Sequence, residues 1–415
     1  MHDVPMKVVV VGSGGREHGL ALVLGRHAEV IVTPGNPGIA GSVPTPVEEL
    51  VADGSVDLVV IGPEQPLVEG LADRLRASGV RVFGPGADGA QVEGSKAYMK
   101  ELAVAAGLPT ARYGAFDEVE PALAFLRTLP GPWVVKTDGL AAGKGVLVTA
   151  SLAEATADVR DKLAGTSFGD AGRTVIVEEC LTGPEVSFFA VCDGTRSVCL
   201  GPAQDFKRVG DGDVGPNTGG IGAWSPLPFT DAGLSAEVVT RFIEPTLTEL
   251  RRRGIDFRGV LYPSFMLTPE GPKLLEYNVR FGDPDSQVVL LRMTSDLAAL
   301  LVAAADGDLT TVPGPTFADD TAVLVVAASE GYPGPPRTGD PIAGLDAAAA
   351  VPGATILCAG VKATDDGTLV TAGGRVIDVV GRGPDAATAR EIAYRAIAEL
   401  SWPGEHHRTD IAGSG

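Results

Sequence analysis

The chain has 415 residues, of which 45% are apolar and 21% charged, and this size predicts about two to four domains with substantial cores. Its formal net charge of -20 attracts neither nucleic acids nor anionic membranes, so we expect no nucleic-acid or membrane partner. No apolar stretch approaches the ~20 residues of a membrane span, and MHDVPMKVVVVGSGG is typical of a first β-strand rather than a signal peptide. The four cysteines form no C-x-x-C pair, which favours buried, reduced thiols and a cytoplasmic protein.

The first segment, 1–108, alternates short apolar strands with helix-compatible stretches. Its predicted strands are KVVVVG, EVIVTPG, DLVVIGPE and VRVFGPG, and each ends in a glycine or proline loop. This pattern predicts a doubly wound parallel sheet, in which ligands bind at the carboxyl ends of the strands. GSGGREH from Gly12 and PGNPG from Pro34 lie at two such ends.

GSGGREH is an incomplete dinucleotide fingerprint, because Glu17 stands where the last glycine belongs. A helix N-terminus here favours a phosphate, although an ordinary tight turn fits nearly as well. His18 fits a ligand contact or a surface position equally.

The next segment, 109–308, mixes strands and helices. A helix over SKAYMKELAVAAG, capped by Ser95 and stopped by Gly107, leads to Pro109, which breaks the chain. Further helices are predicted over Leu152–Leu163 and Ala236–Arg252. The final segment, 309–415, reads as a small α+β domain that ends in a helix from Asp385.

KTDGLAAGKGVLV, from Lys136 to Val148, has the glycines and lysines of a P-loop but not its spacing. Gly145 stands where Ser or Thr is required, and an apolar strand follows instead of a helix. We therefore predict a glycine-rich hairpin whose backbone N–H groups approach phosphate oxygens. Downstream, Glu178, Glu179 and Glu185 are placed to bind an adenine amino group or ribose hydroxyls. A surface hairpin with solvated charges is the alternative.

AQDFKRVGDGDVGPNTGGIGAWSP, from Ala203, is too long and polar for a simple connector. Long irregular loops in compact domains are usually functional or disordered. As a functional loop, it would line a substrate pocket with Asp205, Lys207, Arg208, Asn217 and Thr218, while its glycines form an anion nest.

KLLEYNVRFGDPDSQ, from Lys273, carries the clearest chemical pattern. A strand over Leu274–Phe281 places Glu276, Asn278 and Arg280 on one face, and on the other Leu275, Tyr277, Val279 and Phe281. Carboxylate and amide oxygens suit Mg²⁺, and Arg280 can hold a phosphate or carboxylate. An amphipathic strand with a solvated polar face explains the spacing equally well.

Together these segments resemble the ATP-grasp ligases and, among them, the phosphoribosylamine–glycine ligase family. The resemblance runs in order along nearly the whole chain. It rests on VVGSGGREH, PGNPG, EGSKAYMK, KTDGLAAGKGV, QDFKRVGDGDVGPNTGG, EYNVRFGDPD, GYPGPPRTGD and HRTDI.

The resemblance implies an N-terminal α/β domain, an ATP-grasp core with a mobile lid over about 112–180, and a small C-terminal domain. It also implies a reaction of purine biosynthesis. ATP phosphorylates glycine to glycyl phosphate, and 5-phosphoribosylamine attacks this intermediate to give glycinamide ribonucleotide, ADP and phosphate. The implied partners are small molecules only, and we expect a monomer.

The same resemblance implies roles for individual residues. ATP contacts are expected from Lys96, Lys136, Gly143, Lys144, Gly145, Glu178, Glu179 and Glu185, and Mg²⁺ or Mn²⁺ ligation from Glu276 and Asn278. Arg280, Asp205, Lys207 and Arg208 are expected around glycine and the acyl phosphate. The phosphoribosyl substrate is expected at Gly12, Ser13, Gly14, Gly15, Arg16, Glu17, Asn36, Pro37, Gly38, Asn217, Thr218 and Asp283.

Four positions depart from the family pattern. Phe206 stands where the family usually has His, which puts any polar role of that histidine in doubt. Ile221, Val279 and Asp285 replace Met, Cys and Glu, and the shorter Asp285 would alter any contact made through it. Three rival hypotheses remain: an ATP-grasp ligase with another acceptor, a non-catalytic nucleotide-binding protein, and a dinucleotide oxidoreductase.

Overall fold

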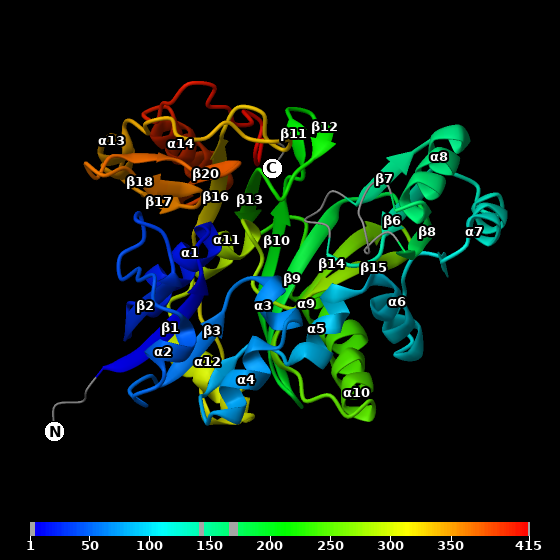
Figure 1. Ribbon diagram of the computed structural model, residues 1–415, viewed down its shortest axis with the longest axis horizontal. Helices are drawn as coiled ribbons and strands as arrows, with labels where there is room; N and C mark the ends of the chain where they lie inside the picture. The colour runs from blue at the N-terminus through cyan, green and yellow to red at the C-terminus, as the bar shows by residue number, and fades with distance from the viewer. Residues whose placement is uncertain (1–4, 141–144, 166–172, 414–415) are drawn as a thin grey trace.

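The computed structural model describes residues 5–140, 145–165 and 173–413. In Figure 1 the blue N-terminal part lies below the orange and red C-terminal part, and the cyan segment around residue 150 projects on the side away from both. Long green strands run between these parts.

The N-terminal part is a four-stranded parallel sheet. Its order is β2-β1-β3-β4, with β1 (Met6–Gly12), β2 (Ala28–Pro34), β3 (Leu58–Ile61) and β4 (Val82–Phe83). Alternate residues of β1 enter two different cores. Val9 packs in the core that contains α3 (Glu64–Val68), α4 (Leu71–Ala77) and α5 (Ala87–Gly94), and Val8 in the core that contains α1 (Gly15–Leu24) and α12 (Leu297–Asp306). The predicted doubly wound sheet is confirmed; a short helix, α2 (Val47–Leu50), completes this part.

Helix α6 (Lys96–Ala105) leads out of the N-terminal part. The Ser95 hydroxyl accepts a hydrogen bond from the Tyr98 amide at 3.1 Å, and Gly107 has a φ of 71°, which favours glycine. The predicted cap and stop are therefore both confirmed.

A second unit is an antiparallel sheet with its own core. Its order is β5-β8-β6-β7, formed by β5 (Tyr113–Phe116), β6 (Trp133–Thr137), β7 (Val146–Thr149) and β8 (Val175–Glu179). Helices α7 (Val119–Leu126) and α8 (Leu152–Leu163) pack against it through Leu123 and Val159. Strands β6 and β7 pair antiparallel, which confirms the hairpin arrangement predicted around the glycine-rich stretch.

An eight-stranded sheet joins the middle of the chain to its C-terminal part. Its order is β15-β14-β9-β10-β13-β16-β20-β17. The strands are β9 (Glu185–Asp193), β10 (Ser197–Asp205), β13 (Gly222–Ser225), β14 (Arg258–Thr268), β15 (Gly271–Asn278), β16 (Thr321–Ala328), β17 (Ala354–Cys358) and β20 (Arg375–Gly383). Because β13 pairs with both β10 and β16, one continuous sheet crosses the boundary expected near residue 308.

Helices and short strands cover this sheet. Helix α14 (Ala386–Ile397) packs on β20 and β16, beside α13 (Leu345–Ala349). Further elements of this part are α11 (Asp285–Leu290), η3 (Leu309–Thr311), β18 (Val361–Ala363) and β19 (Leu369–Thr371).

The expected helix Ala236–Arg252 is divided into three pieces. It comprises α9 (Ala232–Val238), the π-helical η2 (Val239–Ile243) and α10 (Glu244–Arg252). Pro245 has no N–H to donate back to residue 241, so the hydrogen-bond ladder is interrupted where the wider turn occurs.

The prediction for the strand over Leu274–Phe281 was partly wrong. Strand β15 ends at Asn278, and the register shifts so that Ser264 faces Glu276 while Phe265 faces Leu274. Leu275 has no partner at this bulge and is only half-buried, whereas Leu274 is buried in its place. Arg280 lies two residues beyond the end of the strand, although its guanidinium still approaches the Asn278 oxygen at 3.4 Å.

The stretch from Ala203 was expected to be an irregular loop, and it is more regular than that. Strand β10 extends to Asp205, and β11 (Arg208–Gly210) pairs with β12 (Val214–Asn217) as a small hairpin. Its turn contains Asp213 at a φ of 56°, a conformation that Asp tolerates better than most residues.

The expectation of four buried thiols was half right. All four cysteines are free, but only Cys192 and Cys358 are buried. Cys180 follows the last residue of β8 and leaves the sheet, and Cys199 lies on a strand only part of which is covered. In the described ranges, no helix is both long and apolar enough to cross a membrane.

Candidate active site

A buried carboxylate holds two lysines beside the β5–β8 sheet. Glu178 on β8 places one oxygen 3.1 Å from Lys136 Nζ on β6 and the other 3.1 Å from Lys100 Nζ on α6. Lys100 is completely buried and also donates to Thr110 Oγ1 at 2.7 Å. Burial lowers the pKa of Lys100 to about 8, despite Glu178. Burial acts in the same direction on Lys136, but Glu178 and Glu276 outweigh it and raise the pKa of that lysine.

Lys96 is the first residue of α6, and its side chain contacts the start of the predicted phosphate hairpin. Its ammonium group donates to the Gly139 carbonyl at 3.1 Å, while Asp138 accepts hydrogen bonds at 3.1 Å from Ser95 and from the first turn of α6. Gly145 is buried at the far end of the hairpin. Gly143 and Lys144 lie outside the described residues.

Glu276 and Asn278 lie two positions apart on β15, opposite Ser264 and Tyr262 of β14. Burial acts to raise the pKa of Glu276, but Lys207, Lys136 and Lys96 together lower it. Within the described part of the chain, the Glu276 carboxylate has neither a hydrogen-bond donor nor an ion-pair partner in direct contact. It is therefore an ionised carboxylate with free lone pairs.

This pair of oxygen donors fits a hard divalent cation. Among the residues that the structure describes, the Asn278 side-chain oxygen receives only a 3.4 Å contact from Arg280, so it too has a free lone pair. Residues 5–140, 145–165 and 173–413 contain no group of three or more His, Cys, Asp or Glu side chains suited to a metal. A cation bound by Glu276 and Asn278 would thus take its other ligands from water or phosphate, as Mg²⁺ commonly does.

Three more predicted residues gather where β10 ends. Lys207 forms an ion pair with Glu185 of β9. Burial lowers the pKa of Lys207, but Asp205, Glu185 and Glu276 raise it well above its usual value. Burial also raises the pKa of Asp205 to about 7, although Lys207 opposes this. The structure therefore brings Asp205, Lys207 and Glu185 into the electrostatic neighbourhood of Glu276.

Arg208 and Asn217 face each other across the β11–β12 hairpin. The Arg208 guanidinium donates to the Gly215 carbonyl at 2.7 Å and so folds onto the hairpin itself. Thr218 Oγ1 donates to the Lys207 carbonyl at 2.9 Å and accepts from the Gly220 amide at 2.9 Å. Thr218 thus connects the lysine to the turn that follows the hairpin.

Arg280 binds carboxylates of the N-terminal part. Its guanidinium lies 2.8 Å from Glu93 and 3.4 Å from Glu64. Burial acts to lower the pKa of Arg280, but Glu93 and Glu64 raise it well above its usual value. Arg280 therefore fixes the chain just after β15 against helices α3 and α5.

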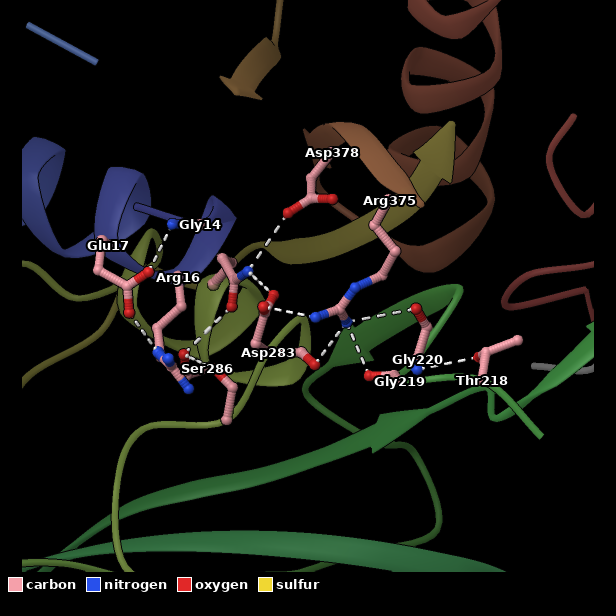
Figure 2. Close-up of polar contacts among 12 residues, drawn as sticks. Gly14, Arg16, Glu17, Thr218, Gly219, Gly220, Asp283, Ser286, Arg375 and Asp378 are labelled. Carbon is pink, nitrogen blue, oxygen red and sulfur yellow. Dashed lines mark hydrogen bonds and ion pairs between the residues drawn. The ribbon is translucent and has the colours of Figure 1, made fainter. Parts of the chain in front are cut away.

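The GSGGREH turn is closed by its own carboxylate, as Figure 2 shows. Glu17 accepts a hydrogen bond from the Gly14 amide and another from Arg16 Nε, each at 2.6 Å. Gly12 has a φ of 133°, and a Cβ there would lie 2.5 Å from Glu17 Cδ. This position of Glu17 explains why the fingerprint is incomplete: the side chain occupies the helix N-terminus.

The PGNPG loop is tied both to this turn and to the C-terminal part. Asn36 Nδ2 donates to the Ser13 carbonyl at 2.8 Å and to the Cys358 carbonyl at 3.0 Å. Its Oδ1 accepts from the Gly38 amide at 2.8 Å, with Pro37 between them. Ser13, Asn36 and Gly38 therefore form one hydrogen-bonded unit.

His18 does not occupy the surface position that was one of its two predicted settings. It is buried, and its Nδ1 accepts from the Cys358 amide at 2.8 Å. Burial lowers the pKa of His18 to about 4, so the ring is neutral at physiological pH. His18 therefore joins α1 to β17.

Asp283 lies among groups from three parts of the chain (Figure 2). Arg375 of β20 donates to its carboxylate at 2.6 Å and to its carbonyl at 2.8 Å, and Gln287 Nε2 donates to its other oxygen at 2.9 Å. Asp378 on β20 contacts the same Gln287 nitrogen at 3.4 Å. A Cβ on Gly15 would lie 1.9 Å from the Asp378 carboxylate, so this glycine permits the close approach.

Sequence reasoning missed Lys100, Glu93 and Arg375. Lys100 follows Lys96 by four residues on α6, a spacing that places both on one helix face and could have identified it. Glu93 lies within a quoted motif, but its partner Arg280 is 187 residues away. Arg375 lies on a strand that carried no recognisable motif.

Three family models match consecutive parts of the chain. They are those of the phosphoribosylglycinamide synthetase N domain at residues 6–93, the ATP-grasp (A) domain at 94–286 and the C domain at 322–414. Together they cover most of the 415 residues.

Individual proteins agree with these models. A phosphoribosylamine–glycine ligase of Streptomyces coelicolor is 48% identical over 98% of this chain and 99% of its own length. The corresponding protein of Rhizobium meliloti is 46% identical over 98% of each chain. The crystal structure of phosphoribosylamine–glycine ligase from Thermotoga maritima superposes with a TM-score of 0.83 at 32% identity, covering 98% of this chain and 100% of that one.

A more distant structure shares the fold alone. The biotin carboxylase domain of 2-oxoglutarate carboxylase from Hydrogenobacter thermophilus has a TM-score of 0.72 at 15% identity, over 98% of this chain and 92% of that one. The matching domains, the high coverage and the identities near one half show that the chain belongs to the phosphoribosylamine–glycine ligase family.

Proposed function

We propose that this protein joins glycine to 5-phosphoribosylamine in de novo purine biosynthesis. A glycine carboxylate oxygen attacks the γ-phosphorus of ATP, the bond to the β-phosphate oxygen breaks, and ADP leaves. The amine of phosphoribosylamine then attacks the carbonyl carbon of glycyl phosphate. Phosphate leaves with the acyl oxygen, and the amine loses a proton as glycinamide ribonucleotide forms.

One observation carries this proposal. The ionised carboxylate of Glu276, which has no direct partner among the described residues, lies in the electrostatic field of three lysines, and the chain belongs to this ligase family. Lys96, Lys136 and Lys207 all act on the Glu276 carboxylate, so they lie around the same region. A site that transfers a phosphoryl group needs such cations to neutralise phosphate oxygens, together with an anionic ligand for the nucleotide's metal ion.

We assign the remaining roles on the same basis. Lys96, Lys136 and the hairpin that includes Gly145 bind the ATP phosphates, and Glu179 lies near the nucleotide. Glu178 supports this set by holding Lys136. Lys207 and Arg280 act on glycine and its phosphate. Asp205, whose pKa burial raises to about 7, accepts the proton that the amine loses.

Glu276 and Asn278 would hold the divalent cation, which we propose to be Mg²⁺. When bound, it screens the phosphate charge and aligns the phosphoryl group. The family shows that ATP is used with a divalent metal. Mn²⁺ offers the same oxygen preference and serves as the comparison metal in the assay.

The loops of Ser13 and Asn36 and the turn of Asp283 are assigned to phosphoribosylamine. We propose that 1–108, 109–308 and 309–415 correspond to the N-terminal α/β, ATP-grasp and C-terminal α+β domains. Four free thiols support a cytoplasmic location, since reduced cysteines are typical of that compartment. A monomer stays a prediction, which light scattering checks.

The test is ADP release by purified protein with ATP, Mg²⁺, glycine and freshly generated phosphoribosylamine, omitting one component at a time. Release that needs every component, with glycinamide ribonucleotide as product, supports the proposal. Release with another acceptor would favour a different ligase. Bound ADP without turnover in any mixture would favour a non-catalytic nucleotide-binding protein.

A further inference from the structure

Gly219 is held from both sides by the C-terminal part of the chain. Its amide donates to the Tyr332 hydroxyl at 2.8 Å, and its carbonyl accepts from Arg375 Nη1 at 2.7 Å. Gly219 follows Thr218, one of the residues expected to bind substrate. One peptide segment of the substrate loop therefore has two of its backbone groups fixed by side chains more than 100 residues away.

Arg375 joins this segment to a second one. The same Nη1 donates to the Asp283 carbonyl at 2.8 Å and approaches the Gly220 carbonyl at 3.4 Å, while Nη2 donates to the Asp283 carboxylate at 2.6 Å. Figure 2 shows the guanidinium between these groups. Both terminal nitrogens are occupied by protein acceptors, so Arg375 acts on the loops and not as a free cation for the substrate.

Local sequence makes room for this arrangement. A Cβ on Gly219 would lie 3.4 Å from both Arg375 Cζ and the Tyr332 hydroxyl, which is van der Waals contact, so both side chains pack directly against this residue. A Cβ on Gly374 would lie 2.2 Å from the Tyr332 ring. Glycine at position 374 therefore leaves the space that the Tyr332 ring occupies beside the loop.

The segment that contains Gly219 is next to residues that we assign to the substrates. Thr218 donates to the Lys207 carbonyl at 2.9 Å, and the Asp283 carboxylate is held between Arg375 and Gln287. A shift of Gly219 or Asp283 would thus move both the residues assigned to phosphoribosylamine and the short connection between β10 and β11 that carries Lys207.

We propose that Tyr332 and Arg375 are positioning residues through which the C-terminal part shapes the phosphoribosylamine subsite. This inference rests on the proposed function and extends it to two residues outside the sets assigned to ATP and to the metal ion. It predicts that their loss weakens binding of phosphoribosylamine more than binding of ATP.

The test compares Arg375→Ala, Arg375→Lys and Tyr332→Phe with the unaltered protein. Arg382→Ala is the matched control, because Arg382 lies on the same strand but pairs with Asp320 at 2.7 Å, away from these loops. The KM for each substrate and kcat are measured separately, and folding is followed by thermal unfolding.

We expect Arg375→Ala to raise the KM for phosphoribosylamine by about tenfold or more, the scale of one lost charged hydrogen bond, with the KM for ATP within about twofold. Guanidinium ion at non-denaturing concentrations should restore part of this loss. Tyr332→Phe should raise the same KM by a smaller factor in a protein that keeps its fold. Arg382→Ala should change neither KM.

Two results would overturn the inference. The first is that Arg375→Ala and Tyr332→Phe both leave every KM unchanged, or both change the KM for all substrates by the same factor. The other is a loss of stability in Arg375→Ala with no rescue by guanidinium and no selective change in Tyr332→Phe. An unaltered protein that forms no glycinamide ribonucleotide overturns the proposed function itself, whereas an active protein with unaffected variants overturns only this inference.

Discussion

The ammonium groups of Lys100 and Lys136 share the two oxygens of one carboxylate, each 3.1 Å from Glu178. The three charged groups come from α6, β6 and β8, and all are buried. A buried charge is tolerated when it is paired. Removal of one partner leaves the remaining charge buried without compensation for its lost hydration. Glu178 therefore stabilises both the fold and the charged state of Lys136.

Glu178→Gln should lower the free energy of unfolding by about 3–5 kcal/mol, the usual cost of breaking a buried ion pair. It should also weaken ATP binding, because Lys136 loses the carboxylate that favours its charged form. Chemical denaturation and calorimetric titration with ATP measure the two effects.

Glu179→Gln is the matched control for stability. Its carboxylate accepts a backbone hydrogen bond from Arg112 at 2.9 Å and faces no buried lysine, so an amide oxygen can replace it. Equal stability losses in the two variants would contradict the special role given to Glu178.

Glu276→Ala should reduce kcat by at least about a hundredfold with little loss of stability, because it removes an anionic ligand whose role lies in charge stabilisation. The carboxylate has no protein donor in direct contact within the described ranges, so its removal leaves no protein partner unpaired. Steady-state ADP release at several Mg²⁺ concentrations, together with thermal unfolding, measures both quantities.

Glu270→Ala serves as the control on the same β14–β15 hairpin. Glu270 lies at the exposed turn, and within the described residues its carboxylate pairs only with Lys273, at 2.8 Å. This variant should keep full activity. Full activity in Glu276→Ala would refute the metal assignment.

Phe206, the position at which the family usually has His, packs beneath Arg408. The guanidinium carbon lies 5.0 Å from the ring centroid, and the same side chain donates to Asp213 and Asp410 at 2.6 Å each. Phe206→Leu keeps most of the apolar volume but removes the π face, so we expect a loss of about 0.5–2 kcal/mol in unfolding free energy. Phe229→Leu, at an exposed ring, should cost less in the same denaturation experiment. Equal losses would argue against a cation–π contribution.

The sequence predicted an element well where that element is determined by neighbouring residues. The cap at Ser95, the helix Leu152–Leu163 and the parallel sheet follow from neighbouring residues and period. The strand of Glu276 was placed correctly, but its bulge at Leu275 depends on pairing with Ser264 and Phe265, which the strand's own sequence does not contain. The continuous sheet across residue 308 likewise depends on β13 pairing with distant strands.

The candidate site was predictable in part for the same reason. Motif resemblance identified Glu276, Lys136 and Lys207 because their residue types are chemically distinctive. It missed Arg375 and Glu93, whose partners lie 92 and 187 residues away, so only the folded chain brings them together. The surface alternative for His18 was wrong, because its ring accepts a hydrogen bond from Cys358 of β17, more than 300 residues later.

His18 makes stability depend on pH in a defined direction. Burial lowers its pKa to about 4 in the folded protein, from 6.5 in an exposed histidine. Between these values the unfolded chain binds a proton that the folded protein does not, so stability falls as pH decreases from about 6.5 to 4. The full effect below pH 4 is on the order of 3 kcal/mol.

His18→Asn should reduce this loss, because the asparagine oxygen can accept the Cys358 amide hydrogen bond without taking up a proton. The unfolding free energies of the two proteins are measured from pH 7 to pH 4.5. As pH falls, the unaltered protein should lose more unfolding free energy than the variant. His27→Asn, which replaces an exposed histidine, controls for the loss of a histidine as such. A difference in unfolding free energy that does not vary with pH would show that His18 binds no additional proton when the chain unfolds. That result would contradict the assignment of His18 as a buried, neutral ring.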